Sequence, residues 1–292
     1  MTENQRTIKS IATIRGIGIQ TGRVVNLKLE PAPPDTGIIF VRTDLHGAPQ
    51  IKADPSNLKE WKPLAQRTIL RSKNAEVQTA EHFLAALSGL FIDNVYAKLD
   101  NLELPGLDGS SREFVSVLRE IGFTEQDAPR RFIEVEKPII CGDEKSSIQL
   151  VHDEEFKIEY FLDYDHPCLR QQWFDITLNR SDDFMDWFDR EVAPSRTFCM
   201  EKEAATLLRA GLGKGADFTN TLVIGNDGPI NNKFRFDNEP ARHKLLDLLG
   251  DLYVFGRHIK GRLTAKKSGH KLNNIFIKRL QEELGRKLVK TA

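Results

Sequence analysis

The stretch Ala80-Glu-His-Phe-Leu-Ala-Ala-Leu-Ser-Gly89 matches a second stretch, Ala241-Arg-His-Lys-Leu-Leu-Asp-Leu-Leu-Gly250, without a gap. The alanine, the histidine, two leucines and the glycine coincide, and both stretches have the apolar spacing of a helix. Glu81 precedes the first histidine, whereas Asp247 follows the second by four residues. A duplicated helix that diverged in this way would bring two histidines and one aspartate to a single metal ion.

The composition is that of a globular protein and excludes several other classes. The chain has 292 residues, which is enough for two domains. Hydrophobic residues make up 40% of the chain and charged residues 29%. A formal net charge of zero gives no electrostatic basis for bulk nucleic-acid binding. No apolar run reaches the ~18 residues of a spanning helix, so we expect no transmembrane segment. Because the N-terminus lacks an apolar signal core, we expect a cytoplasmic protein. A monomer is also expected. The three scattered cysteines are expected to be free thiols.

The two halves of the chain repeat one order of elements. In each half, short apolar runs between turns predict strands, which are followed by an amphipathic helix, a further strand and a second amphipathic helix. The first half is expected to have strands at 11–19, 24–29 and 38–41, a helix at 79–90, a strand at 95–99 and a helix at 114–121. The second half is expected to have strands at 132–140, 147–151 and 156–162, a helix at 239–255, a strand at 262–265 and a helix at 274–284.

This order predicts an α+β fold built from an internal duplication. The polar segment 124–131 contains a proline and is the expected boundary between domains 1–127 and 128–292. The halves also differ by insertions, at about 42–70 and at about 198–228, and the second contains a helical run and a strand. Because two amphipathic helices per half must bury their apolar faces, we expect the two helical layers to pack together and bring the copied helices into contact.

The copied helices carry a candidate metal site. His243 and Asp247 are four residues apart and therefore project from one helix face, which Asp251 extends by a turn. His82, in the equivalent position of the sister helix, would be the third ligand. Imidazole and carboxylate suit zinc, and three protein ligands leave one position open, as in catalytic zinc sites. A surface ion pair between His243 and Asp247 is the alternative interpretation.

Other residues suggest the remaining chemistry less specifically. Glu81 lies beside a proposed ligand, where a base could act on metal-activated water, although a first-turn glutamate is also favoured by the helix dipole. In the polar turn Lys266-Lys-Ser-Gly-His270, His270 could be a general acid and Lys267 could meet a phosphate, or the segment is a solvated basic loop. Gly211-Leu-Gly-Lys-Gly215 lacks Walker spacing, so no phosphate loop is expected there. The remaining histidines lack partner spacing and are expected to be structural or on the surface: His46, His152, His166 and His258.

Taken in order, six stretches resemble the zinc-dependent UDP-3-O-acyl-N-acetylglucosamine deacetylases of lipid A synthesis, over nearly the whole chain. They are Thr79-Ala-Glu-His82, Pro105-Gly-Leu-Asp-Gly109, Ser195-Arg-Thr-Phe198, Ala241-Arg-His-Lys-Leu245 with Asp247, Gly250-Asp251 and Lys267-Ser-Gly-His270. The resemblance implies two β-α-α-β domains with helices sandwiched between two sheets and an insert in each domain. It also implies that the 198–228 insert is a βαβ unit forming a passage for the substrate's acyl chain. The apolar residues Leu207, Leu208, Leu212 and Phe218 suit that passage, and core packing is the alternative for each of them.

The resemblance also implies roles for individual residues. His82, His243 and Asp247 match the zinc ligands, although two histidines and a carboxylate also suit Fe²⁺. A water activated by the metal would attack the acetyl group of UDP-3-O-acyl-N-acetylglucosamine and release acetate. The matched acid–base and substrate residues are Glu81 as general base, His270 as general acid, Asp251 as the carboxylate that orients His270, Thr197 as a hydroxyl that polarises the carbonyl, Lys244 and Lys267 at the polar part of the substrate, and Phe198 near the sugar and acyl path.

One position departs from the family pattern. The first-domain turn commonly reads Gly-hydrophobic-His-Thr-Gly, whereas this chain has Gly18-Ile-Gln-Thr-Gly22. Gln20 cannot carry a proton near pH 7, so a charge at that position is not expected here. Two rival functions stay open: a zinc amidase acting on a peptide or another acetylated sugar, and a duplicated binding module without chemistry.

Overall fold

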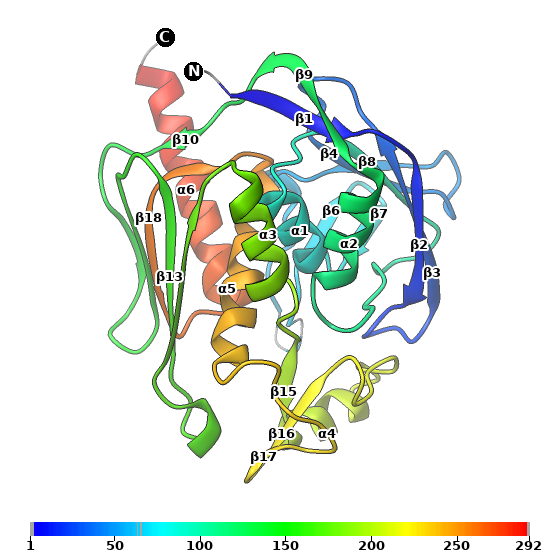
Figure 1. Cartoon of the computed structure of the whole chain (residues 1–292), viewed down its shortest axis with the longest axis vertical. Helices are drawn as coiled ribbons and strands as arrows, with labels where there is room; N and C mark the ends of the chain where they lie inside the picture. The colour runs from blue at the N-terminus through cyan, green and yellow to red at the C-terminus, as the bar shows by residue number, and fades with distance from the viewer. Residues whose placement is uncertain (1–2, 63, 65, 291–292) are drawn as a thin grey trace.

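The computed structural model describes residues 3–62, 64 and 66–290 and arranges them in three layers. Two β-sheets flank a layer of helices, and the two chain termini lie at the same end of the molecule (Figure 1). The sheet on the right of Figure 1 comes from the first half of the chain and the sheet on the left from the second half. Mixed helices and sheets of this kind are an α+β fold, as expected.

The first sheet has five strands, and alternating side chains explain its one buried face. In β3, every second residue from Val25 to Leu29 is buried while the residues between them are exposed, which is the period of a half-buried strand. In spatial order the strands are β2 (Ala12–Ile17), β3 (Val24–Pro31), β8 (Val95–Leu99), β4 (Ile38–Arg42) and β5 (Gln50–Lys52).

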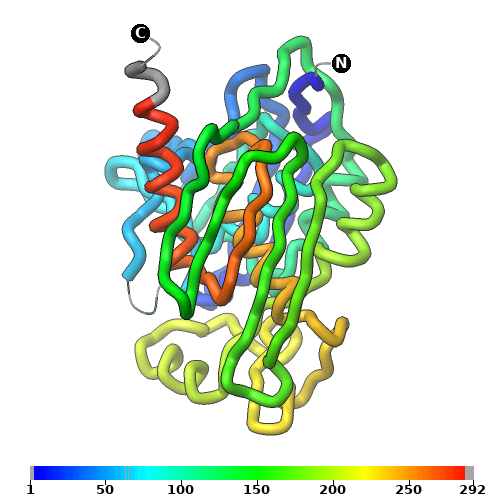
Figure 2. The backbone as a smooth tube through the Cα atoms, turned by 90° about the vertical axis from the view of Figure 1, so that its left-hand side faces the viewer, coloured from blue at the N-terminus to red at the C-terminus, as the bar shows by residue number. Residues whose placement is uncertain are grey.

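The second sheet repeats the strand pairing of the first. In spatial order its main path is β11 (Ile139–Gly142), β12 (Ser147–Val151), β18 (Ile259–Lys266), β13 (Phe156–Leu162) and β14 (Gln172–Leu178). In both sheets the central strand runs antiparallel to one neighbour and parallel to the other, and both outer pairs are antiparallel. A short sixth strand, β10 (Ile133–Glu134), pairs in parallel with β18. Figure 2 views this sheet with the helices behind it.

The helices between the sheets bury the apolar faces that the sequence predicts. They are α1 (Glu81–Gly89), α2 (Arg112–Ile121), α3 (Asp182–Glu191), α5 (Glu239–Leu252), which continues as a 3₁₀ turn η3 (Tyr253–Phe255), and α6 (His270–Lys290). All nine residues of α1 are buried, because α5, α2 and the first sheet surround it. The two copied helices, α1 and α5, lie against each other in the centre of the molecule (Figure 1).

The second insert stands apart from the three layers. It comprises β15 (Phe198–Met200), α4 (Glu201–Arg209), β16 (Leu222–Gly225) and β17 (Gly228–Pro229), and its first two strands pair in parallel around α4. It extends from the end of the molecule opposite the termini (Figures 1 and 2). The described residues of the first insert, about 42–70, do not form a separate unit. Its strand β5 is an edge strand of the first sheet, and β6 (Ile69–Ser72) forms a hairpin with β7 (Ala75–Gln78). Between β5 and β6 lies a 3₁₀ turn, η1 (Pro55–Asn57).

Several predicted elements differ from the structure. The expected domain boundary, 124–131, overlaps a strand that was not predicted, β9 (Phe123–Pro129), which pairs with β1 (Asn4–Ile8) in a largely exposed ribbon held by backbone hydrogen bonds. The predicted strand 132–140 is divided into β10 and β11, since Pro138 lacks the N–H that a continuous ladder needs. Helix α6 begins four residues earlier than predicted, at His270. The elements that were not predicted include the strands β1, β5, β6, β7, β9 and β14, the helix α3, and the turn η2 (Pro167–Leu169) that precedes β14.

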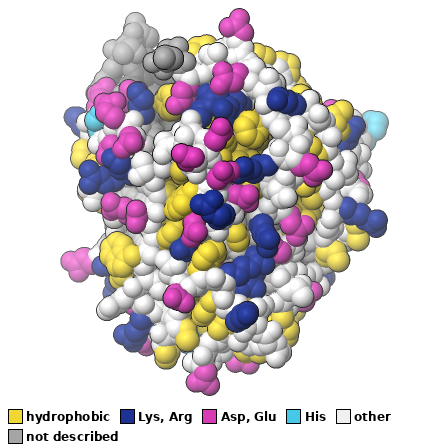
Figure 3. All heavy atoms as spheres, in the orientation of Figure 1, with side chains coloured by type: hydrophobic (Ala, Val, Ile, Leu, Met, Phe, Trp, Pro, Cys, Tyr) yellow, Lys and Arg dark blue, Asp and Glu magenta, His cyan; other side chains and the backbone are white. Residues whose placement is uncertain are grey.

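The surface and the helices agree with the balanced composition. Within the described part of the chain, no helix combines the length and apolar character needed to cross a membrane. Figure 3 shows basic and acidic side chains interspersed over the visible face, with apolar side chains between them and no field of one sign.

Candidate metal centre and active site

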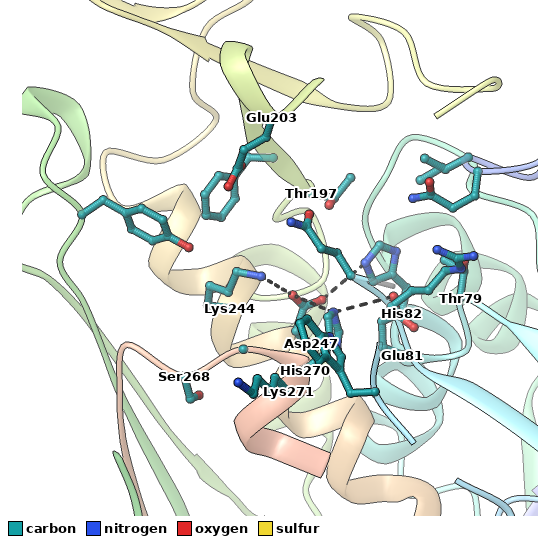
Figure 4. A pocket seen from close by; sticks show the side chains of 18 residues that line it. Thr79, Glu81, His82, Thr197, Glu203, Lys244, Asp247, Ser268, His270 and Lys271 are labelled. Atoms are coloured by element: carbon teal, nitrogen blue, oxygen red, sulfur yellow. Dashed lines mark hydrogen bonds and ion pairs between the residues drawn. The ribbon is translucent and has the colours of Figure 1, made fainter. Parts of the chain in front are cut away.

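The contact between α1 and α5 brings the three predicted ligands together. His82 Nε2 lies 3.5 Å and His243 Nε2 lies 3.3 Å from the same oxygen, Oδ1 of Asp247. All three side chains are buried, and one ligand atom from each lies within 4.8 Å of the others. Figure 4 shows the histidine of α1 and the aspartate of α5 facing each other across the cavity. The spacing is that of a site able to hold one cation.

A glycine allows the two helices to approach this closely. A Cβ on Gly250 would lie 2.0 Å from the backbone oxygen of Glu81, so a larger residue would push the helices apart. The equivalent residue of the first copy, Gly89, meets the ring of Phe188 on α3 instead, with a Cβ at 2.4 Å. The same glycine position therefore allows two different close contacts, one with the backbone of α1 and one with a side chain of α3.

The donor set fits a metal ion. Oδ1 of Asp247 is buried and has no hydrogen-bond partner among the described residues, whereas Oδ2 accepts a 2.9 Å bond from Lys244 Nζ. The His243 ring is oriented by the Ser195 carbonyl, which lies 3.0 Å from Nδ1, so Nδ1 carries the proton and Nε2 keeps its lone pair. A buried carboxylate oxygen without a donor is costly unless a cation occupies the site. Two imidazoles and one carboxylate are a donor set that suits Zn²⁺ or Fe²⁺.

The protonation states of two ligands favour metal binding, and that of the third opposes it. Burial lowers the pKa of His243 to about 3, so this imidazole is neutral at pH 7. Burial opposes ionisation of Asp247, but neighbouring His243 and Lys244 outweigh it and hold its pKa well below the ordinary value. For His82, burial is outweighed by Asp247 and Glu81, which raise its pKa, so protons compete with a metal ion more strongly at His82 than at His243.

A carboxylate and an imidazole flank the ligand cluster. Glu81 is buried, and burial raises its pKa towards the range useful for a base at neutral pH. His270 Nε2 lies 4.0 Å from Glu81 Oε1 and 3.7 Å from Asp247 Oδ2. Its Nδ1 is 2.8 Å from Asp251 Oδ2. Burial opposes the charged imidazole, but Asp251 and Asp247 outweigh it and raise the pKa of His270 to about 9.

The Ser195–Phe198 segment is fixed by both halves of the chain. Arg196 forms a buried ion pair with Glu239 in the first turn of α5, with Nε 2.9 Å from Oε1. Thr197 donates its backbone N–H to Gly109 at 2.7 Å, and Gly109 must be glycine because a Cβ there would lie 1.7 Å from the Asn220 oxygen. The Thr197 side chain consequently lies on the insert side of the cluster (Figure 4).

Two adjoining cavities meet at this segment. One of about 220 Å³ is lined by two of the predicted ligands, His82 and Asp247, but not by His243, and by other polar residues that include Glu81, Lys244 and His270. The other, of about 370 Å³, lies within the insert and is lined mainly by apolar side chains. Both are lined by the same five residues, Ile19, Gln20, Gln66, Thr197 and Phe198. A polar reacting group could occupy the first cavity while an apolar chain extends into the second.

Some of the remaining predicted substrate residues line one of the two cavities, and others line neither. Leu207 lines the apolar cavity, but Leu212 is not among the described residues that do. Lys244 lines the polar cavity, with Nζ 5.5 Å from the centre of the Phe198 ring, although it is also bound to Asp247. Lys267 is not among the described residues lining either cavity; its Nζ lies 3.7 Å from Asp163. Lys271, the second residue of α6, lines the polar cavity instead.

Gln20 connects the first half of the chain to the insert. Its side-chain Oε1 accepts a 3.1 Å bond from the Gly213 N–H, and the backbone of Ile19 accepts a 3.0 Å bond from Gly215. The carboxylate of Glu103 accepts the backbone N–H groups of Gln20 and Thr21 and so holds the turn in place. The position that departs from the family pattern therefore closes one side of the apolar cavity.

Sequence reasoning missed several residues around the cluster. Asn273 donates a 2.7 Å bond to Asp251 Oδ2, and its position three residues after His270 would have indicated this had α6 been predicted to start there. Thr68 contacts both Glu81 and Asp251, and no local pattern marks it. Other cavity-lining residues that were not predicted are Trp61, Gln66, Arg67, Tyr164, Glu203 and Lys271.

Comparison with known proteins agrees with this site. A family model described as UDP-3-O-acyl N-acetylglycosamine deacetylase matches residues 5–282. The chain is 38% identical to the UDP-3-O-acyl-N-acetylglucosamine deacetylase of Acidithiobacillus ferrooxidans, covering 94% of this chain and 89% of that protein. It is 35% identical to the protein of that name from Myxococcus xanthus (96% and 87% covered) and 36% identical to that from Hahella chejuensis (94% and 90%). The chain belongs to the UDP-3-O-acyl-N-acetylglucosamine deacetylase family.

Proposed function

We propose that this protein hydrolyses the acetamide of UDP-3-O-acyl-N-acetylglucosamine, giving the free amine and acetate, in the synthesis of lipid A. The observation that carries the proposal is the convergence of His82, His243 and Asp247 beside Glu81 and His270, with four of these five side chains lining a polar cavity. Family membership alone would leave the chemistry open, because a fold can keep its shape after losing its reactive groups.

The metal is proposed to be Zn²⁺, with Fe²⁺ as the alternative for this donor set. When bound, such a cation lowers the pKa of a water molecule from 15.7 to about 7 and polarises a carbonyl. His82, His243 and Asp247 would hold it, and Lys244 fixes Asp247 through the oxygen that faces away from both histidines. The contribution of the protein would thus be an ionised carboxylate with one oxygen bound by Lys244, and two imidazoles, of which His243 is oriented by the Ser195 carbonyl.

Glu81 is proposed as the general base. It would take a proton from the attacking water, and its raised pKa makes the transfer more favourable near neutral pH than for an exposed glutamate. Thr197 would donate its hydroxyl to the oxyanion that develops on the acetyl carbonyl. His270 is charged at neutral pH and would give its Nε2 proton to the leaving amine, while Asp251 holds its Nδ1.

The apolar cavity is proposed to receive the 3-O-acyl chain. Its lining residues include Leu207, Ala204 and Val223, and it opens beside Thr197 and Phe198, next to the reacting centre. Burial of a methylene contributes roughly 0.8 kcal/mol, so even part of a fatty acyl chain supplies substantial binding energy. The polar cavity would take the sugar, with Lys244 as the proposed cation at its polar groups; Lys267 stays proposed for the same role at the rim.

The remaining organisation of the protein is also proposed. We assign two domains, 1–127 and 128–292, related by duplication, because their sheets share one pairing pattern and their central helices share one sequence pattern. The three cysteines are unpaired, as in proteins of a reducing compartment, which supports action in the cytoplasm.

An assay of acetate release tests the proposed activity. The protein is purified without added metal, its metal content is measured, and the zinc-loaded form is given UDP-3-O-acyl-N-acetylglucosamine or an N-acetylated sugar that lacks the acyl chain and the nucleotide. Acetate is expected from the first substrate in preference to the second. Equal rates on both would favour a less specific amidase, and no acetate from zinc-loaded protein would favour a binding module.

A further inference from the structure

Thr68 touches both sides of the proposed acid–base pair. It is fully buried and immediately precedes β6 in the first half of the chain. Its backbone N–H donates a 2.9 Å hydrogen bond to Glu81 Oε2. Its side-chain hydroxyl donates to Asp251 Oδ1, across the boundary between the two halves. One residue therefore restrains the base directly and the acid through its carboxylate partner.

The other oxygens of the two carboxylates face His270. Glu81 Oε1 lies 4.0 Å from His270 Nε2, on the reactive side of the ring. Asp251 Oδ2 lies 2.8 Å from His270 Nδ1 and accepts a 2.7 Å bond from Asn273. A closed series of contacts thus connects the proposed base and acid: Glu81 to Thr68, Thr68 to Asp251, Asp251 to His270, and His270 back to Glu81.

The hydroxyl of Thr68 sets the rotation of the Asp251 carboxylate. A buried carboxylate oxygen that loses its donor turns to find another, because an unsatisfied buried charge is expensive. Rotation of Asp251 would carry Oδ2 away from Nδ1 and turn the imidazole that it holds. A displacement of about 1 Å at a reacting group can cost roughly 100-fold in rate.

We propose that Thr68 is a positioning residue that sets the distance and direction between Glu81 and His270. Its backbone fixes the base and its hydroxyl fixes the partner of the acid, so the two groups keep one geometry although they come from different halves of the chain. The inference rests on the proposed function for its effect on turnover. It rests on the hydrogen bonds alone for its effect on the His270 ring.

Three substitutions separate the hydroxyl from the volume of the side chain. Thr68→Val keeps the branched shape and removes the donor, Thr68→Ser keeps the donor, and Thr68→Ala removes both the hydroxyl and the methyl group. In zinc-loaded protein, Thr68→Val is expected to lower kcat at least about tenfold with KM and zinc content unchanged. Thr68→Ser is expected to restore most of kcat. Thr68→Ala serves in place of Thr68→Val if the valine variant does not fold.

A second readout needs neither metal nor turnover. In metal-free protein labelled with ¹⁵N-histidine, the Nδ1 proton of His270 bonded to a carboxylate gives a downfield NMR signal, which is assigned with His270→Gln. The account predicts that this signal moves or broadens in Thr68→Val and returns in Thr68→Ser, measured at a temperature at which both variants remain folded. Wild-type kcat and an unchanged signal in Thr68→Val would overturn the proposal, as would a loss that serine does not restore. Failure of the wild-type protein to release acetate would count against the proposed function, and the NMR comparison would still decide the role of Thr68.

Discussion

The two copied helices, α1 and α5, have the same core and different functional faces. Both place a histidine one turn or less from their start and a glycine at the equivalent later position. Helix α1 carries one proposed ligand and the proposed base next to it, whereas α5 carries two proposed ligands and Asp251, which contacts the proposed acid His270. The comparison teaches that a shared scaffold fixes where the histidines meet, while substitutions around them determine the chemistry.

The largest expected effect is on kcat, when the proposed base on α1 is replaced and the proposed ligand beside it is kept. Glu81→Gln is expected to keep zinc, because Glu81 is not a ligand, and to lower kcat by about 10²–10⁴-fold, since the amide cannot accept the proton. Metal analysis and steady-state kinetics of the same preparation check this. Glu203→Gln, in the same cavity, is the matched control and should retain most activity. Near-normal turnover in zinc-loaded Glu81→Gln would remove Glu81 from the mechanism.

The corresponding test on α5 concerns the pH profile. His270 must be charged to donate a proton, so activity is present below its pKa of about 9 and is lost as pH rises through that value. Asp251→Asn removes the largest of the three carboxylate effects on His270, which lowers its pKa and moves the alkaline limb of kcat/KM to lower pH. A bound cation would lower the pKa in both proteins, so the difference between them is the measurement. Coincident alkaline limbs would show that Asp251 does not act on His270.

The shared glycines give a smaller, structural contrast. Gly250→Ala places a methyl group against the rigid backbone of α1, and the overpacking should cost about 1–3 kcal/mol of stability and weaken zinc binding. Gly89→Ala meets the ring of Phe188, which is a side chain rather than helix backbone, so its overpacking requires no separation of two helices; the gain of about 0.5–1 kcal/mol of alanine over glycine within a helix applies to both variants. Urea denaturation should therefore show the larger loss for Gly250→Ala, and the reverse order would contradict the packing argument.

The sequence predicted most of the centre of the molecule and less of its edges. The sequence revealed the matched histidines because the apolar residues of α1 and α5 recur every three to four positions, which allows the two helices to be aligned. The structure brings the two histidines together. Helix α3 was missed although Ser181 caps it, because its acidic residues interrupt the apolar spacing. Strand β9 was missed because exposed ribbons carry little apolar signal. Thr68 and Glu103 could not be found, since their partners lie far away in the chain.

The smallest expected effect lies where the first half of the chain meets the insert. Gln20→Ala removes the acceptor for the Gly213 N–H, a bond worth about 1 kcal/mol, so KM for a long-chain substrate should rise about fivefold with kcat little changed. Gln20→His, which restores the family residue and an acceptor nitrogen, is the matched control. Kinetics with a long-chain and a short-chain substrate check this, and an equal effect on both would separate Gln20 from the acyl cavity.

The most direct test of the account is a zinc titration of metal-free protein in competition with a chromophoric chelator, comparing the wild type with His82→Ala. The account predicts one zinc ion per wild-type chain. It also predicts an affinity loss in His82→Ala larger than the ~10–100-fold that follows removal of an outer hydrogen-bond partner. Equal zinc affinity in the two proteins would contradict the claim that α1 and α5 bind one metal ion between them.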